Sequence, residues 1–361
     1  MKNDFTTRLK KIDAILENEL PQNYSDSWLD NTFAKTYAPI PTNLLESLVI
    51  PCRELLLLGG KRWRPLFMVL CSELALENNT TLSEDEKNRI LERVYSLTPI
   101  IEFVHTASLI HDDIEDAADM RRGKPSAYIT YGIDTAINCG SWLYFQATKC
   151  LSDKINIWQE NEQNLKISLY EQLTLELRRL HLGQAMDISW HKNNEIVPTI
   201  SEYLTMTSLK TGTLASLSAK LGLLASGESV EKAQIIATAA AQIGIAFQII
   251  DDIKNLTTGN VGKKRGDDIV EGKKSLPVLF HLESNKDDFE DLMQCFRMAR
   301  KEGIDSKYVE AAIAIIEKSN AIEKARTKAS ELLQDACKTI KDLYTNCNTT
   351  TLIEDLFTSM C

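Results

Sequence analysis

Three aspartates and a glutamate stand within residues 112–116, at the end of an apolar stretch that begins at Ile100. The apolar residues recur at helical spacing, so Asp112 and Asp116, four residues apart, point from one face near the C-terminal end of a helix. Like charges there repel one another and oppose the helix dipole. A solvated helix end is one interpretation. The other is oxygen ligation of Mg²⁺, which is typically shared between carboxylates and the phosphates of a substrate.

A second acidic cluster follows much later in the chain. The uncharged stretch 233–250 ends in Asp251 and Asp252. Gln248, Asp251 and Asn255 lie at i, i+3 and i+7, again on one face of a helix. Taken alone, this cluster is equally compatible with an ordinary exposed helix end. Paired with the first cluster, it is a candidate half of a clamp for metal ions and a diphosphate.

Positive charge is concentrated in four glycine-containing segments of an otherwise acidic chain. Lysine and arginine number 41 against 51 aspartates and glutamates, and the net charge of −10 disfavours general binding to nucleic acid or to anionic membranes. Cations beside glycines, which allow a close approach of the backbone, instead suit a phosphate. A charged loop and an intramolecular ion network are the alternatives. The segments are Gly59–Arg64, Arg121–Lys124, Lys210–Gly212 and Gly262–Lys273.

His105 stands seven residues before Asp112 and therefore shares its face of the helix. It is either part of the same site or a core histidine. The other histidines lack metal-ligand spacing and receive no role. No nucleophile motif, Walker sequence or dinucleotide-binding glycine pattern stands out.

Long helices must position these groups. Glycine and proline number only 15 and 9 among 361 residues, which disfavours a many-stranded β-structure. Helical apolar spacing covers residues 1–20 and resumes at 44, whereas the prolines of 21–43 indicate a loop. We expect an all-α fold with an N-terminal helix and loop over 1–43, one domain over 44–345 and a tail over 346–361.

The cysteines and the apolar stretches bear on where the protein resides. Eight cysteines without a CxxC pair indicate reduced thiols and a cytoplasmic location. The N-terminal residues lack the apolar core of a signal peptide. Stretch 233–250 carries three glutamines and ends at two aspartates, so we expect a buried core helix rather than a membrane span.

In order and spacing, these motifs resemble the trans-isoprenyl diphosphate synthases, the polyprenyl synthetase family of farnesyl, geranylgeranyl and longer-chain enzymes. The resemblance covers about two thirds of the chain. It implies an all-α bundle of the isoprenoid synthase type around a central cavity, usually a homodimer, and a Mg²⁺-dependent prenyltransferase. The matching segments are GGKRWRP (59–65), HTASLIHDDIEDAADMRRGKPSAY (105–128), GQAMD (183–187), MTSLKTGTL (206–214) and a last one over 247–278 that opens with FQIIDDIKNL.

The resemblance also implies the metal ligands and the reaction. Mg²⁺ would be bound by Asp112, Asp116 and Asp251, with Asp113 and Asp252 in support. Metal ions and cations would neutralise the departing diphosphate, so that the allylic C–O bond ionises. The double bond of isopentenyl diphosphate would attack the carbocation, and the released diphosphate would take the proton. The residues of this catalytic set are Asp112, Asp113, Asp116, Lys210 and Asp251.

Two substrates need two sets of binding groups, and the family's roles transfer to both. Allylic diphosphate would be held by Arg121, Lys210, Thr211, Gln248, Lys263 and Lys273. Isopentenyl diphosphate would be held by Lys61, Arg64, His105 and Arg122.

One residue departs from the family's common pattern, and two other functions compete. The second motif of the family commonly ends in aspartate, but here that position is Asn255. Eukaryotic-type geranylgeranyl synthases also carry asparagine there.

A class I terpene cyclase shares the acidic motif but takes one diphosphate and needs no isopentenyl pocket. A non-catalytic subunit of a heteromeric synthase is expected to lose the first-motif aspartates, which this chain retains.

Product length depends on the side chains below the aspartates on the helix that ends near Asp112. Ser108 lies nearly under Asp112, and Ala107 occupies the position where short-chain members tend to carry an aromatic residue. Both are small, which favours a product of twenty carbons or more. Close helix packing is the alternative reason for their size. Aromatic residues that could form a floor from a neighbouring helix are Trp142, Tyr144 and Phe145.

We predict that Ala107→Phe or Ser108→Phe shortens the product, because the ring would block the path of the growing chain. The measurement is the product distribution of each variant beside that of the wild type. The wild type should reach at least twenty carbons, and at least one variant should stop earlier. A wild type that already stops at fifteen carbons would move the floor elsewhere, with Trp142 as the next candidate.

Overall fold

The computed structural model describes residues 2–152, 158–193, 195–259, 264–345 and 347–358. As expected, the fold is all-α, and the described residues add only a two-stranded hairpin, β1 (Met120–Arg121) and β2 (Lys124–Pro125). Contacts divide the chain into two compact units. Unit 1 comprises Met1–Thr174, Leu217–Gln234 and Asn346–Ile353, and unit 2 comprises Leu175–Ser216, Ile235–Thr345 and Glu354–Cys361. The domain boundaries expected from the sequence remain a prediction.

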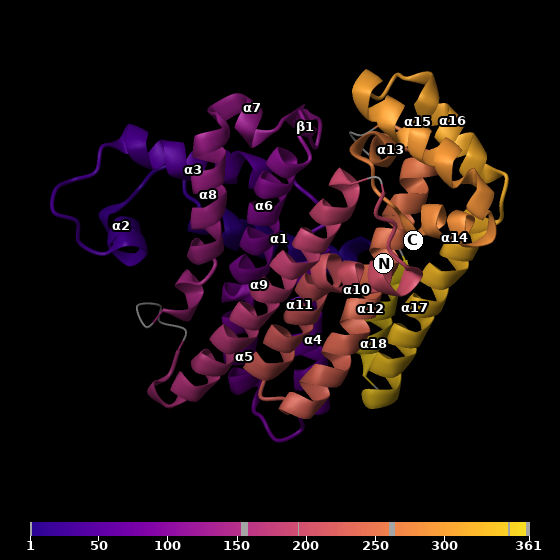
Figure 1. Ribbon diagram of the computed structural model, residues 1–361. Helices are drawn as coiled ribbons and strands as arrows, with labels where there is room; N and C mark the ends of the chain where they lie inside the picture. The colour runs from indigo at the N-terminus through magenta and orange to yellow at the C-terminus, as the bar shows by residue number, and fades with distance from the viewer. Residues whose placement is uncertain (1, 153–157, 194, 260–263, 346, 359–361) are drawn as a thin grey trace. The chain divides into compact units, whose positions relative to one another are not determined.

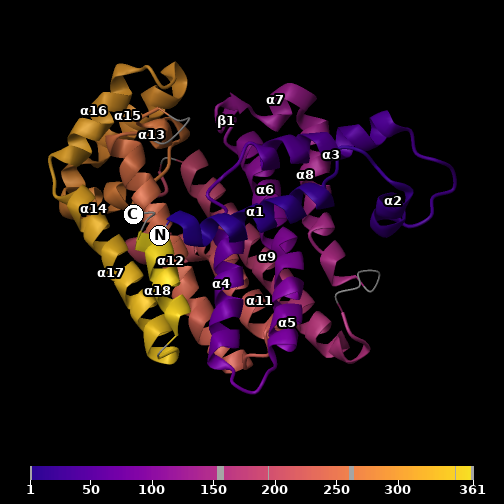
Figure 2. The same cartoon turned by 180° about the vertical axis from the view of Figure 1, so that it is seen from behind.

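Unit 1 contains the N-terminal helices and the hairpin. In both Figure 1 and Figure 2, α6 lies beside α8, and α3 crosses the same end of the unit. The helices of this unit are α1 (Lys2–Glu19), α2 (Asp26–Phe33), α3 (Thr42–Leu57), α4 (Trp63–Asn78), α5 (Glu84–Ser96), α6 (Thr98–Glu115), α7 (Ala127–Tyr131) and α8 (Ile133–Gln146).

Unit 2 contains most of the C-terminal half, in which α15 packs on α16 and α14 packs on α17. Four helices contribute residues to both units. The helices within unit 2 are α10 (Ile200–Thr207), α13 (Asp267–Glu271), α14 (Leu276–Ser284), α15 (Phe289–Glu302), α16 (Lys307–Glu317) and α17 (Ala321–Leu343). The shared ones are α9 (Gln163–Lys192), α11 (Thr213–Ala225), α12 (Val230–Thr257) and α18 (Asn348–Thr358).

Two expectations about individual segments meet different outcomes. The segment 21–43, expected to be a loop, contains α2, because Ser25 caps this helix and its Trp28 is buried and donates to the Glu19 carbonyl at 3.2 Å. The stretch 233–250 lies in α12, which is long and apolar enough to span a membrane. More than half of its most apolar window is nevertheless buried inside the protein, so it is a core helix.

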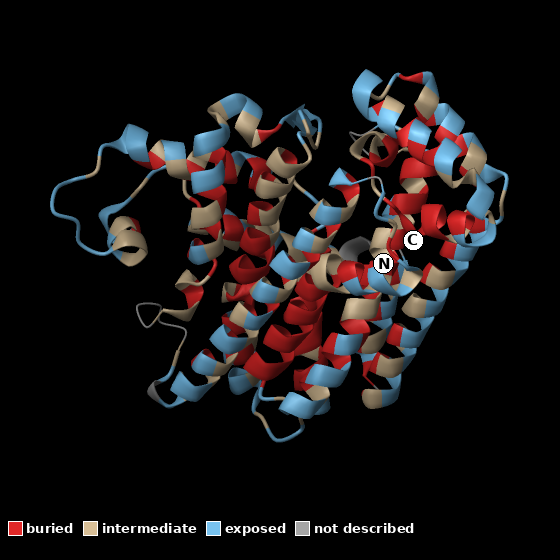
Figure 3. Cartoon of the chain, in the orientation of Figure 1, coloured by how far each residue is buried: buried red, intermediate tan, exposed pale blue. Residues whose placement is uncertain are grey.

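Close helix packing in unit 1 depends on small residues. Figure 3 shows α11 as a continuously buried helix, and most residues of α4 are buried as well. Helix α4 faces Gly222 of α11, where a Cβ atom would lie against the Met68 carbonyl oxygen and 3.0 Å from the Cys71 Cβ. Interiors are close-packed, so any side chain at this glycine would force the two helices apart.

The start of α18 is tied to α4 by one carboxylate. Glu77 accepts hydrogen bonds from the Asn348 and Thr349 amides, at 2.7 and 3.1 Å, and from the Thr349 hydroxyl at 2.8 Å. Burial tends to raise the pKa of Glu77, but these three hydrogen bonds outweigh it and lower the pKa. The folded state therefore favours the ionised carboxylate, which satisfies the free amides of the helix N-terminus.

We predict that Glu77→Gln loosens the start of α18. Amide exchange at Asn348 and Thr349 should accelerate about threefold at neutral pH, the modest scale of one exposed cap. A lowered folded-state pKa contributes stability above the unfolded pKa, and this is lost as pH falls. The difference between variant and wild type should thus vanish below about pH 4. Glu84→Gln, whose carboxylate is 83% exposed, serves as control, and an equal effect from it would contradict the capping role.

Candidate active site

The first aspartate motif occupies the last turn of α6 in unit 1. Asp112 and Asp116 are partly exposed, whereas Asp113 is 1% exposed and points into the unit. Arg121 of β1 donates to Asp113 at 2.7 Å through Nε and to Asp112 at 3.3 Å through Nη2. The ion network that the sequence left open is therefore present, and it fixes the hairpin against the end of α6.

Asp113 serves mainly as the inner anchor of this arrangement. Burial raises the pKa of its carboxyl group, and the Arg121 guanidinium opposes that rise. Its Oδ2 atom has no hydrogen-bond partner among the described residues. Asp112 and Asp116 are left as the partly exposed pair, which agrees with their expected role as oxygen ligands.

The glycine pair before α4 receives the next arginine of the hairpin. Arg122 donates to the carbonyl oxygens of Gly59 and, at 3.4 Å, Leu55. At Gly60 a Cβ atom would lie 3.1 Å from the Arg122 Nη2 atom, so a side chain there would displace the guanidinium. Gly59 therefore provides a hydrogen-bond acceptor for Arg122, and Gly60 provides the space for its guanidinium.

Arg62 stabilises the same loop through ion pairs inside unit 1. It is 6% exposed, has a left-handed backbone with φ 47°, and pairs with the buried Glu102 and, at 3.1 Å, with Asp13 of α1. The sequence analysis assigned neither Arg62 nor Glu102 a role, because a buried ion pair between distant residues leaves no local spacing pattern.

The residues expected to bind isopentenyl diphosphate gather around His105. Burial lowers the pKa of His105, and the charges of Arg64 and Arg122 lower it further. The imidazole is therefore neutral near pH 7 and adds no charge to the guanidinium groups near it. Arg64 also lies over the Trp63 ring, 4.5 Å from its centroid, and Lys61 is exposed. Unit 1 thus brings Arg64 and Arg122 close to His105, whereas the position of the Lys61 side chain relative to them remains a prediction.

The two chain-length residues lie on α6 as expected. Ala107 is fully buried, and Ser108 donates to the His105 carbonyl at 2.8 Å. Among the three aromatic residues of α8, Tyr144 lies beside His111 with ring centroids 5.7 Å apart. It is therefore the aromatic side chain of α8 that adjoins the last turns of α6.

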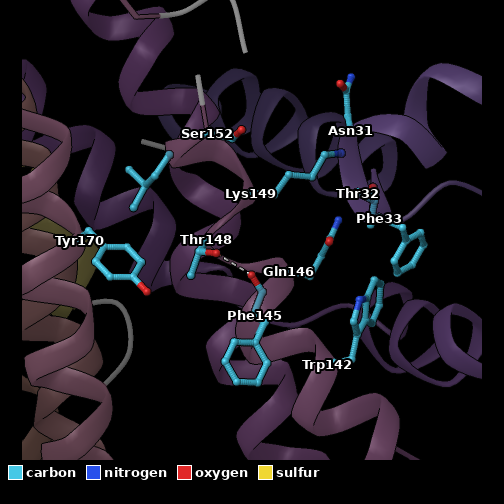
Figure 4. A pocket seen from close by; sticks show the side chains of 11 residues that line it. Asn31, Thr32, Phe33, Trp142, Phe145, Gln146, Thr148, Lys149, Ser152 and Tyr170 are labelled. Atoms are coloured by element: carbon cyan, nitrogen blue, oxygen red, sulfur yellow. Dashed lines mark hydrogen bonds between the residues drawn. The ribbon is translucent and has the colours of Figure 1, made fainter. Parts of the chain in front are cut away.

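The other two aromatic residues of α8 line a separate cavity of about 450 Å³. Trp142 stacks on Phe33 of α2 at 6.3 Å between ring centroids, and Phe145 is 75% exposed. Figure 4 shows these side chains around the cavity with Lys149 and Tyr170. Trp142 thus packs against the N-terminal segment.

Unit 2 holds the second group of site residues around a helix irregularity. Residues Ser208–Gly212 form a π-helical turn between α10 and α11, and this turn presents Lys210 and Thr211. Such turns often occur at functional sites. The Lys210 ammonium donates to Asp187 of α9 at 2.6 Å.

Glycines allow the neighbouring helices to approach this turn. At Gly183 of α9, a Cβ atom would collide with the Lys210 backbone nitrogen and lie 2.8 Å from the Leu209 carbonyl carbon. At Gly244 of α12, a Cβ atom would lie 2.7 Å from the Gly212 Cα. The backbone that carries Lys210 is therefore clamped between α9 and α12.

Asp187 is a site residue that the sequence analysis did not single out. Burial tends to raise its pKa, but the charges of Lys210 and Lys273 outweigh burial and lower the pKa. The carboxylate stays ionised and holds two of the expected allylic-diphosphate ligands near it. Its position four residues after Gly183, on the same face of α9, was the available signal.

The second aspartate motif divides into an outer and an inner part. Asp251 is exposed, whereas Asp252 accepts from the Tyr203 hydroxyl at 2.6 Å and from the Gln248 amide at 3.0 Å. Gln248 in turn accepts from the Thr211 hydroxyl at 3.0 Å. A continuous hydrogen-bond chain therefore connects Asp252 to two of the expected allylic-diphosphate ligands.

Two of the remaining expectations fare differently. Lys273 is partly exposed and pairs with Glu271, whereas Lys263 lies outside the described residues. Asn255, expected on the face of Asp251, is 1% exposed. Its side chain contacts the backbone of α13, whereas Asp251, on the same face of α12 by spacing, is exposed.

An acidic pair at a helix end and groups of lysines and arginines on an all-α fold are typical of enzymes that bind a metal ion together with a diphosphate. The sequence profile of the polyprenyl synthetase family matches residues 46–316, and the chain belongs to this family. It is a trans-prenyltransferase, an isoprenyl diphosphate synthase.

Several known proteins are similar to the chain. A geranylgeranyl pyrophosphate synthase of Apiospora sacchari is 33% identical over 84% of each chain. One of Macrophomina phaseolina is 33% identical over 70% of this chain and 72% of its own. The solved geranylgeranyl pyrophosphate synthetase of Pyrococcus horikoshii superposes with a TM-score of 0.78 at 27% identity, covering 99% of this chain and 97% of its own.

We predict that Gly183→Ala lowers kcat/KM for the allylic substrate by roughly tenfold to a hundredfold, because the new methyl group displaces the Lys210 backbone. Steady-state kinetics and thermal denaturation of the purified variant provide the measurement. The control is Ala185→Gly, an exposed change on the same helix that weakens helix propensity without touching the π-helical turn. Equal kinetic losses in both variants would contradict the steric argument.

Proposed function

We propose that the enzyme condenses isopentenyl diphosphate with an allylic diphosphate, head to tail, and makes geranylgeranyl diphosphate. The observation that carries this proposal is the presence of two distinct cation groups. Arg64 and Arg122 surround His105 in unit 1, and Lys210 and Lys273 flank Asp187 in unit 2. Two diphosphates need two such groups, whereas a cyclase needs one.

Mg²⁺ fits the acidic residues that the chain offers. Asp112 and Asp116 provide hard oxygen ligands from one helix turn, and Asp251 provides another. Among the described residues, no three acidic, histidine or cysteine side chains converge on one ion. Mg²⁺ typically keeps several waters and is bound by one or two carboxylates together with substrate phosphates. The ion supplies electrostatic stabilisation of the leaving diphosphate.

The chain's own groups prepare the allylic substrate for ionisation. Arg121, Lys210, Thr211, Gln248, Lys263 and Lys273 bind its diphosphate. As the C–O bond breaks, charge accumulates on the diphosphate oxygens, where preorganised ammonium and guanidinium groups stabilise it. Asp187 keeps the ammonium groups near it charged and oriented.

The isopentenyl side positions the nucleophile. Lys61, Arg64, His105 and Arg122 bind the second diphosphate, so that its terminal double bond attacks the allylic carbocation. A new C–C bond forms, and the proton lost from the isopentenyl unit goes to the released diphosphate. A neutral His105 can form a hydrogen bond with the diphosphate without adding a positive charge beside Arg64 and Arg122.

A twenty-carbon product is supported by two independent observations. Ala107 and Ser108 are small, so they would obstruct a growing chain less than an aromatic residue at either position. Relatives that cover most of the chain are named geranylgeranyl pyrophosphate synthases.

We also propose that the enzyme is a cytoplasmic homodimer with one synthase domain over residues 44–345. The outer face of α7 and α8 carries apolar side chains that a partner would cover. Exposed on it are Ile129, Ile133, Ile137 and Phe145, at 50%, 55%, 48% and 75%. All of its described cysteines are free thiols, which suits a reducing compartment.

The test is an assay of the purified chain with Mg²⁺, isopentenyl diphosphate and allylic diphosphates of several lengths. We predict that Asp112→Ala loses more than about two orders of magnitude in kcat.

Arg64→Ala should instead raise KM for isopentenyl diphosphate much more than KM for the allylic substrate.

The exposed Arg326, 59% accessible, provides the control variant Arg326→Ala. Turnover without isopentenyl diphosphate would favour a cyclase, and no turnover with any substrate would favour a non-catalytic subunit. An equal rise of both KM values in Arg64→Ala would show that the isopentenyl site is misassigned.

A further inference from the structure

The side chain of Asn255 faces α13 and not the solvent. Its Oδ1 atom accepts a hydrogen bond from the Asp268 backbone amide at 3.2 Å. Its own carbonyl oxygen accepts from the Gly266 amide at 2.8 Å. Asn255 therefore contacts the first turn of α13 through both its side chain and its backbone.

This contact replaces a cap that α13 cannot provide itself. The amides of a helix's first turn lack intrahelical acceptors, and the side chain of the N-cap residue usually supplies one. Here the N-cap is Gly266, with φ 85° and no side chain, and a Cβ atom there would collide with Val309. Asn255 thus supplies from α12 the acceptor that sterics forbid at Gly266.

The residue that receives the cap also holds Lys273. The Asp268 carbonyl oxygen accepts from the Lys273 amide at 2.8 Å and from the Gly272 amide at 2.9 Å. Asp268 therefore donates to Asn255 through its amide and accepts from Lys273 through its carbonyl. One peptide segment connects the fifth position of the second motif to a lysine of the allylic-diphosphate group.

We infer that Asn255 is a positioning residue: its amide oxygen caps α13 and thereby fixes the backbone of Lys273. The inference rests on the proposed role of Lys273 in binding the allylic diphosphate. The inference also assigns different functions to different residues of the second motif. Asp251 alone among Asp251, Asp252 and Asn255 is exposed, and the Asn255 oxygen is directed at an amide rather than outward to a metal.

Hydrogen exchange tests the cap without reference to activity. In Asn255→Ala, exchange of the amides of Asp268 to Lys273 should accelerate about fivefold, the scale of losing one helix cap. Asn285→Ala is the matched control, because Asn285 bonds the His281 carbonyl at a different helix end, at 3.1 Å. Unchanged protection of α13 in Asn255→Ala would overturn the inference. If that variant does not fold, Asn255→Ser, which is too short to reach Asp268, takes its place.

A double-mutant cycle tests whether Asn255 acts through Lys273. Lys273→Ala should raise KM for the allylic diphosphate at least about tenfold, as expected for a lost charged hydrogen bond. Asn255→Ala should raise it about fivefold, leave KM for isopentenyl diphosphate within twofold and add nothing when combined with Lys273→Ala. Full additivity, or an equal rise of both KM values, would refute a positioning role. No effect of Lys273→Ala alone would instead refute the proposed function of Lys273, and hydrogen exchange then decides the cap by itself.

The Mg²⁺ dependence distinguishes a cap from a metal ligand. Asn255→Asp retains an oxygen that can accept from Asp268, so protection of α13 should persist and the Mg²⁺ concentration for half-maximal rate should change less than twofold. A ligand role would lower that concentration in Asn255→Asp and raise it in Asn255→Ala. Either change beyond threefold would overturn the inference.

Discussion

The arrangement of unit 1 depends on neutralising several guanidinium groups within a mainly apolar bundle. Burying a charge is costly unless it is paired and hydrogen-bonded. Three arginines around α6 are stabilised by different partners: Arg62 by Glu102, Arg121 by Asp113, and Arg122 by backbone carbonyls. These partners neutralise the arginines inside the unit, while Asp112 and Asp116 remain partly exposed at the end of α6.

In unit 2, the ammonium group of Lys210 comes from a backbone segment that is not regular α-helix. The π-helical turn places Lys210 and Thr211 side by side, and Gly183 and Gly244 allow α9 and α12 to close on it. A π-helical turn inserts one residue and would be unfavourable alone. Packing from two sides holds it in place, and Asp187 then fixes the ammonium of Lys210.

The sequence predicted the parts of this structure that local spacing encodes. Helical periodicity indicated the all-α fold, and the i, i+4 aspartates indicated the last turn of α6. Spacing placed Asp112 and Asp116 on one face of the helix, but it could not predict that Arg121 of the hairpin pairs with Asp113. It also could not show that Asn255 is buried, because α13, which contacts this residue, follows only after a glycine-rich segment. Glu102 gave no local signal, since its partner Arg62 lies far away in the sequence. Asp187 lay within the GQAMD segment, but spacing did not predict its ion pair with Lys210.

The region that the family profile matches leaves out the N-terminal helix, although this helix belongs to unit 1. The profile match begins at residue 46, yet α1 precedes it and buries Ile12 and Leu16 fully or nearly so in unit 1. Arg8 binds Glu73 through two hydrogen bonds of 2.8 Å, and Asp13 binds Arg62. A left-handed backbone at a non-glycine residue such as Arg62 costs about 1–3 kcal/mol and persists only where its surroundings over-determine it. Asp13, Glu102 and the Leu56 carbonyl provide that restraint, so the N-terminal helix is part of the framework that shapes the Gly59–Arg64 loop.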